Sequence, residues 1–155
     1  SIKIGDKLVG IPSSGFHSNG YSLIRKVLEV NNISLNSESV KEVLLTPTRI
    51  YVREVLQLLK EHVIKGMAHI TGGGMTENIP RILPQGMGVT IHKGTWDIPR
   101  EMTWLQEIGQ ISEVEMYRTF NMGIGFMMVV DPETAAKLSY PIIGEVTEGQ
   151  GVVYQ

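Results

Sequence analysis

A loop rich in small polar residues, Pro12–Gly20, holds the side chains of this chain that are best suited to chemistry. It carries three serines, an asparagine and His17, with Gly15 and Gly20 among them. Glycine lets the backbone approach a ligand closely or adopt a positive φ. Histidine changes its charge near neutral pH, so His17 is a candidate acid–base group or a group that stabilises developing charge. A structural role for a lone histidine stays open.

The elements on either side of the loop decide what it can bind. The apolar stretch Leu8–Ile11 predicts the end of a buried strand, and the apolar residues of Tyr21–Leu28 recur at helical spacing. The loop therefore leads into a helix N-terminus, whose free N–H groups and positive dipole end suit an anion. We expect Ser18 or Asn19 to be the N-cap. The same residue types dominate ordinary turns, so a plain capped turn is the alternative.

A second strand–glycine–helix junction is predicted around Gly72–Gly74. A short buried strand is expected over Gly66–Thr71 and a helix over Met75–Leu83, with Glu77 in its first turn. A glycine triplet is entropically costly, which favours a ligand-facing loop over a tight crossover. His69, on the predicted strand, is expected to be a hydrogen-bonded core residue or one that supports the site. If both loops lie at one edge of a sheet, two helix N-termini converge there on a phosphate.

The remaining elements indicate an α/β fold, a mixed β-sheet flanked by helices. The segment 50–63 predicts an amphipathic helix with Thr48 as its N-cap and Glu54 on a solvated face. Residues 142–146 and 152–154 are expected to pair as a closing hairpin through Thr147–Gly151. Further helices are expected at 37–45 and 100–108, after Ser112 and after Asp131, and further strands at 87–92 and 123–130.

Composition excludes several classes of protein. The 155 residues suffice for a single domain spanning 1–155, and 42% hydrophobic with 19% charged residues is typical of an ordinary globular protein. A formal net charge of −2 argues against a nucleic-acid partner or an anionic membrane surface. The absence of cysteine excludes disulfides, thiolate zinc sites and a cysteine nucleophile. No signal peptide and no apolar run of membrane-spanning length are evident, so the cytoplasm is the expected location.

Common nucleotide and metal motifs are missing. There is no Walker lysine loop, no dinucleotide fingerprint, no His-Glu-x-x-His and no calcium loop. The acidic residues are scattered, so we expect no metal site made by this chain alone.

Four stretches in order resemble the signature of the phosphoribosylformylglycinamidine cyclo-ligase family, also called aminoimidazole ribonucleotide synthetases. The resemblance covers most of the chain but only the C-terminal domain of that enzyme. The stretches are Pro12–Lys26, Leu45–Val52, His69–Gly74 running into Glu77–Arg81, and Glu115–Gly123.

The resemblance implies an ATP-dependent ring closure in purine biosynthesis. In the family, ATP activates the formyl oxygen of formylglycinamidine ribonucleotide, an amidine nitrogen closes the imidazole ring, and ADP and phosphate leave. ATP and Mg²⁺ are associated mainly with the N-terminal domain, which also forms the homodimer and is missing from this chain. The isolated domain is therefore expected to be inactive. The chain is also shorter than its relatives between Leu138 and Tyr140.

The site residues that follow from the loops and the resemblance fall into three groups. His17 would contact the reacting formyl–amidine group or stabilise charge there. The ribose phosphate or the transferred phosphate of a phosphoribosyl substrate would be held by Ser13, Ser14, Gly15, Ser18, Asn19 and Gly20. The opposite wall would be formed by Thr71, Gly72, Gly73, Gly74, Glu77 and Asn78. Asn121 and Arg118 are weaker candidates, and Arg118 is alternatively an internal salt-bridge partner.

Two alternatives stay open. Selenophosphate synthetase, thiamine monophosphate kinase and a hydrogenase maturation factor share the two-domain architecture of the cyclo-ligase. A non-catalytic module that binds a phosphorylated metabolite belongs to a different class.

Overall fold

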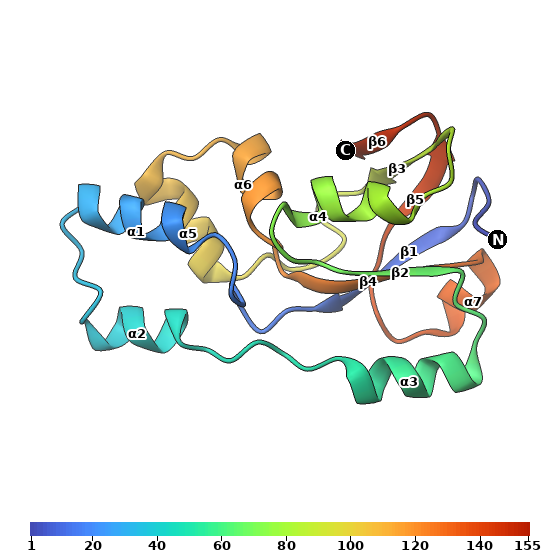
Figure 1. Cartoon of the computed structure of the whole chain (residues 1–155), viewed down its shortest axis with the longest axis horizontal. Coiled ribbons are helices and arrows are strands. Elements are labelled where there is room, and N and C mark those ends of the chain that lie inside the picture. Colours follow the sequence, from blue (N-terminus) through green and yellow to red (C-terminus); the bar gives the residue numbers. More distant parts are fainter.

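A six-stranded mixed sheet in the order β2-β4-β1-β5-β3-β6 forms the centre of the molecule (Figure 1). The structure is a computed structural model and describes residues 1–155. The strands are β1 (Lys7–Pro12), β2 (Gly66–His69), β3 (Met87–Ile91), β4 (Ile124–Val130), β5 (Ile142–Glu148) and β6 (Gly151–Tyr154). The helices are α1 (Tyr21–Val30), α2 (Glu38–Leu44), α3 (Val52–Glu61), α4 (Gly74–Asn78), the 3-10 helix η1 (Ile79–Ile82), α5 (Arg100–Gly109), α6 (Glu113–Thr119) and α7 (Pro132–Lys137).

The two faces of the sheet carry separate cores. Side chains alternate between the faces of a strand, so Leu8 of β1 joins the larger core while its neighbour Val9 joins the smaller one. The larger core takes apolar residues from α1, α4, α5 and α6, which lie together on one side of the sheet (Figure 1). The smaller core includes Val55 of α3 and Ala135 of α7. The predicted mixed sheet flanked by helices is therefore confirmed.

Strand directions bring distant loops to one edge. β1 and β2 both pair antiparallel with β4, which lies between them, so β1 and β2 run in the same direction. Their carboxyl ends therefore lie at the edge where β4 begins. The only parallel pair in the sheet is β3 with β6.

The predicted closing hairpin is wrong, because β5 and β6 do not pair with each other. β3 lies between them, antiparallel to β5 and parallel to β6. The connecting turn crosses the start of β3, where the N–H of Gly149 donates to the carbonyl of Gly86. Gly88 leaves room for this crossing, since a Cβ there would stand 2.9 Å from both Gln150 N and Gly151 O.

Two other element predictions need correction. β2 ends at His69 and is a half-exposed edge strand instead of a buried strand reaching Thr71. The predicted helix Met75–Leu83 is split into α4 and η1. Pro80 has no N–H to continue the α-helical ladder, so the chain tightens into a 3-10 turn there.

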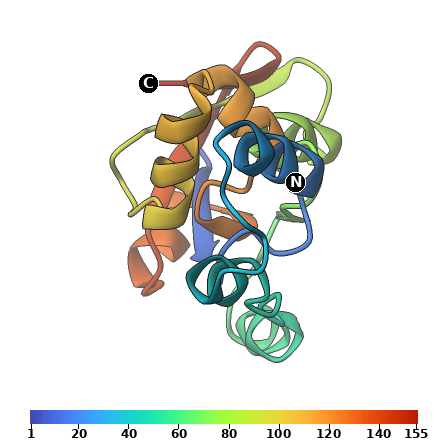
Figure 2. The same cartoon turned by 90° about the vertical axis from the view of Figure 1, so that its left-hand side faces the viewer.

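α3 begins later than predicted and packs loosely. Its N-cap is Tyr51, so the cap predicted at Thr48 is wrong. Val55 is its only buried residue. Seen from the side, α2 and α3 lie along the lower edge of the molecule (Figure 2), and Val40 of α2 joins the larger core. None of the helices is long and apolar enough to cross a membrane.

Candidate functional site

The two glycine-rich loops lie side by side at the edge of the sheet where β1 and β2 end. The first loop runs from Ser13 to Gly20 and the second from Ile70 to Gly73. Oδ1 of Asn19 lies 3.8 Å from the position that a Cβ on Gly72 would occupy. The sequence prediction that both loops meet at one edge is therefore confirmed as geometry.

Asn121 holds the first loop from inside the protein. Its side chain is buried, and Oδ1 accepts hydrogen bonds from Ser13 Oγ (3.0 Å) and from the N–H of Gly123 (2.8 Å). Nδ2 donates to the carbonyl of Gly15 (2.8 Å). Three of its four hydrogen-bonding positions are thus used within the protein. Asn121 therefore holds the loop from its buried side, and the Ser13 hydroxyl is already used in a hydrogen bond to Asn121.

Asn78 performs the same task for the second loop. Nδ2 donates to the carbonyls of Gly72 (3.1 Å) and Gly74 (2.7 Å), and Oδ1 accepts from Thr71 Oγ1 (3.2 Å). The side chains of Thr71 and Asn78 therefore face each other inside the loop. Glu77 is exposed, and its side chain folds back over Gly73, where a Cβ would overlap it.

Glycine is required at two of these positions by close packing. Gly20 has φ 79°, and a Cβ on it would collide with the ring of Phe120. Gly74 has φ 60°, and a Cβ would stand 2.7 Å from the carbonyl oxygen of Phe120. The small residues thus serve helix packing as well as any ligand approach.

The predicted cap of α1 is wrong. Its N-cap is Gly20 in a left-handed conformation, and no side chain caps the helix. The Ser18 side chain is exposed, and neither Ser18 Oγ nor the Asn19 amide has a hydrogen-bond partner in the protein. These two groups and the first N–H groups of α1 are therefore the unengaged donors of the loop.

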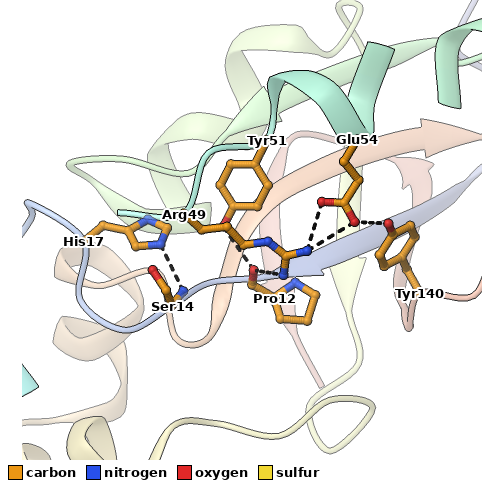
Figure 3. Close-up of polar contacts among 7 residues, drawn as sticks. All are labelled: Pro12, Ser14, His17, Arg49, Tyr51, Glu54 and Tyr140. Carbon is orange, nitrogen blue, oxygen red and sulfur yellow. Dashed lines mark hydrogen bonds and ion pairs between the residues drawn. The ribbon is translucent and has the colours of Figure 1, made fainter. Parts of the chain in front are cut away.

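His17 is buried, with only 4% of its surface exposed, and its backbone has a positive φ of 56°. Nε2 accepts a hydrogen bond from the N–H of Ser14 at 3.1 Å (Figure 3). An accepting nitrogen carries no proton, so this contact assigns the proton of the neutral ring to Nδ1. Nδ1 is buried and has no partner. His17 thus presents an unused N–H donor.

The surroundings of His17 keep it neutral. Burial lowers the pKa of His17 from 6.5, and the electrostatic effects of His69 and Arg49 lower it further. Ring centroids lie 6.4 Å away for His69 and 6.2 Å away for Tyr51. His69 is exposed and its side chain makes no hydrogen bond, so the hydrogen-bonded core position considered for it is wrong. A role in supporting the site stays a prediction.

An apolar groove of about 520 Å³ lies beside these rings, between α3 and the edge strand β2. Tyr51, His69 and Phe126 form aromatic contacts with one another along it. It is lined by Thr48, Arg49, Ile50, Tyr51, Val52, Val55, Leu56, Leu59, Met67, His69 and Phe126.

The structure corrects the predicted surroundings of Arg118 and Glu54, while the substrate-binding role of Arg118 stays a prediction. Arg118 is exposed on α6 and forms no ion pair, so the internal salt bridge considered for it is wrong. The solvated face predicted for Glu54 is wrong, because its carboxylate binds Arg49 and accepts from the Tyr140 hydroxyl (Figure 3). The five-residue spacing of Arg49 and Glu54 is not a helical pair spacing, so periodicity gave no signal for this contact.

A family model described as AIR synthase related protein, C-terminal domain, matches residues 3–155. The chain belongs to this family. The chloroplastic phosphoribosylformylglycinamidine cyclo-ligase of Arabidopsis thaliana is 46% identical over 100% of the chain and 44% of the relative. The phosphoribosylformylglycinamidine cyclo-ligase of Desulfitobacterium hafniense DCB-2 is 50% identical over 99% of the chain and 49% of the relative. The chain thus spans about half the length of the curated relatives that it matches.

Solved structures agree on the fold of this AIR synthase-related domain. Thiamine-monophosphate kinase from Stenotrophomonas maltophilia has a TM-score of 0.64 at 14% identity, covering 99% of the chain and 51% of the kinase. The HypE-HypF complex has a TM-score of 0.65 at 19% identity, covering 99% and 50%. At such identities the likeness concerns the fold alone.

Proposed function

We propose that this chain is the C-terminal, substrate-side domain of a phosphoribosylformylglycinamidine cyclo-ligase. The observation that carries the proposal is 46–50% identity, over nearly the whole chain, to curated proteins of that name. The full protein would convert formylglycinamidine ribonucleotide to aminoimidazole ribonucleotide with ATP, in de novo purine biosynthesis. A cytoplasmic location belongs to the same proposal.

The unengaged donors of the first loop support a phosphate site. Ser18 Oγ, the Asn19 amide and the first N–H groups of α1 meet no protein partner, and Asn19 Oδ1 lies beside Gly72 of the second loop. An uncapped helix N-terminus with hydroxyl and amide donors suits a phosphate monoester. Ser13 and Ser14 hydroxyls are already used by Asn121 and by the Pro47 carbonyl, so they would act by shaping the loop.

His17 would act as a hydrogen-bond donor. Its Nε2 is occupied by the Ser14 N–H, so a general base at this nitrogen would have to give up that bond. Nδ1–H can instead donate to an oxygen that gains negative charge during ring closure. Because Nδ1 is shielded, side chains around it would have to move for the substrate to reach it.

Magnesium does not fit the residues of this chain. The described residues 1–155 include no group of three or more histidine or acidic side chains that could hold a metal ion. We therefore assign Mg²⁺ and most of the ATP contacts to the N-terminal domain of the full protein. That domain would also form the homodimer.

The experiment that tests the proposal uses the full-length protein. Purified protein is given ATP, Mg²⁺ and formylglycinamidine ribonucleotide, and aminoimidazole ribonucleotide is measured by a colorimetric amine assay alongside ADP. Substrate-dependent formation of both products supports the proposal. Thiamine monophosphate serves as the comparison substrate, because one solved structure of the same fold is named for it. Phosphorylation of thiamine monophosphate without ring closure would overturn the assignment.

A further inference from the structure

The segment Pro47–Tyr51, here called the strap, lies against the end of β1 and the start of the first loop (Figure 3). The hydroxyl of Ser14 donates to the Pro47 carbonyl at 2.7 Å. The Pro12 carbonyl accepts from Arg49 Nη1 and from the Tyr51 hydroxyl, both at 3.0 Å. This carbonyl is free to accept because the register of β1 with β4 shifts between Ile11 and Pro12.

The strap is anchored by a chain of charged and polar groups. Arg49 Nη2 binds both carboxylate oxygens of Glu54, at 2.9 Å and 3.2 Å. The same carboxylate accepts from the hydroxyl of Tyr140, which precedes β5. Glu54 of α3 thus holds Arg49 in one orientation, and Tyr140, which is far away in the sequence, holds Glu54.

Little apolar packing helps to hold the strap. Residues 45–50 are exposed or half-buried, and only Tyr51 of the strap reaches the core. The helix that follows buries Val55 alone. The position of the strap therefore depends on its polar contacts.

The strap ends against His17. The Tyr51 hydroxyl and the His17 ring both lie over Gly125 of β4, where a Cβ would overlap the Tyr51 hydroxyl and stand 2.8 Å from His17 Cε1. Ser14, which donates its N–H to His17, donates its hydroxyl to the strap. Two contacts thus transmit the position of the strap to the imidazole.

We propose that Arg49, oriented by Glu54 and Tyr140, is a positioning residue that fixes the His17 imidazole through the Pro12 carbonyl and the strap. This inference rests on the proposed function, since it names the residue that aligns the Nδ1–H donor of His17. The charged and titratable groups around the imidazole are Arg49 and Tyr51 of the strap and His69 of β2, with Glu54 behind Arg49.

The test uses the full-length protein with Arg49→Gln, Arg49→Lys and the control Arg53→Gln. Arg53 is exposed on α3 and forms no ion pair. Three quantities are measured: kcat and KM, the melting temperature, and the titration of His17 by NMR of ¹³C-labelled histidine, assigned with a His17→Gln variant.

Arg49→Gln is expected to lower kcat about 10- to 100-fold with a much smaller change in KM, because the imidazole is misplaced and not lost. The His17 titration should move to higher pH, since a nearby positive charge is removed. Arg49→Lys should keep the low titration but not restore kcat, because an ammonium cannot reproduce the forked contact. Arg53→Gln should change neither.

The proposal is overturned if Arg49→Gln leaves kcat or the His17 titration unchanged, or if Arg53→Gln has the same effects. If Arg49→Gln fails to fold, Tyr140→Phe decides. It removes one hydroxyl and should lower kcat in the same direction, and an unchanged kcat would refute the positioning role. The NMR readout does not depend on which reaction is catalysed, so failure of the cyclo-ligase assay alone would count only against the proposed function.

Discussion

The N–H of Ser14 donates to Nε2 of His17, three residues later in the same loop, at 3.1 Å. This short-range contact fixes the tautomer of a buried histidine and leaves its second nitrogen as a donor. The loop therefore defines the chemistry of its own histidine before any ligand is considered.

Replacement of His17 by Ala in the full-length protein should reduce kcat about 10²- to 10³-fold, the usual effect of removing one donor to a developing oxyanion. The fold should persist, because Asn121 still holds the loop. Steady-state kinetics and circular dichroism separate the outcomes. An unfolded variant would make His17 structural, and an unchanged rate would place it outside the chemistry.

Stability should fall as the pH drops below about 6.5, in part through His17. Its pKa is lowered from 6.5 in the folded state, so the unfolded chain binds the proton more readily. The contribution is complete above the unfolded pKa and is lost as the pH decreases through 6.5 toward the folded value. Thermal denaturation at pH 7.5 and 5.5 should show a smaller acid destabilisation in His17→Gln than in wild type. His62→Gln is the matched control, and equal losses in all three proteins would contradict the prediction.

Asn121→Leu should destabilise the protein by about 2–4 kcal/mol, since three hydrogen bonds are lost and buried partners remain. Urea unfolding measures the change. Asn36→Leu is the control, because Asn36 is exposed and its side chain makes no hydrogen bond. Comparable stability of the two variants would show that Asn121 does not hold the loop.

Asn19→Asp should weaken binding of the phosphoribosyl substrate about 10- to 100-fold, by placing a carboxylate against the phosphate. The stability of α1 should not change, because Gly20 and not Asn19 is its N-cap. Calorimetry on the full-length protein gives Kd, with Asn36→Asp as the control for added charge. Equal substrate affinity in Asn19→Asp and wild type would remove this loop from the phosphate site.

The 155 residues alone should neither hydrolyse ATP nor close the ring, because they carry no phosphate-binding lysine loop and no carboxylate cluster. The measurement is ADP release and product formation, with the full-length protein as the positive control. Turnover by the isolated chain would contradict the two-domain assignment.

Strong periodicity made much of the fold predictable. The apolar spacing in Tyr21–Leu28 and the apolar run ending at Val130 gave α1 and β4 nearly in full. The pairing of β5 and β6 failed because a short loop is compatible with a hairpin, whereas β3, distant in sequence, competes for the same edge. Strand order depends on such long-range contacts, which no local pattern records.

The candidate site was predictable only in part. Two strand–loop–helix junctions were enough to place the glycine loops together. The buried side chains of Asn121 and Asn78 contact backbone carbonyls whose positions are defined only by the fold. Arg49 and Tyr140, which both contact Glu54, are 91 positions apart in the sequence, so residue spacing could not have linked them.

The position of β4 between β1 and β2 has a consequence for synthesis of the protein. Both loops are complete in the chain by Gly74, yet their strands do not pair with each other, and within the sheet they are linked only through β4, which follows Gly123. Asn121, which shapes the first loop, arrives just before β4. A nascent chain on the ribosome therefore holds the loops for nearly fifty codons before they can be assembled, since N-terminal segments emerge first. During that interval the exposed edges of β1 and β2 are open to mispairing, and shielding by a chaperone or by a domain already folded upstream would be of most value then.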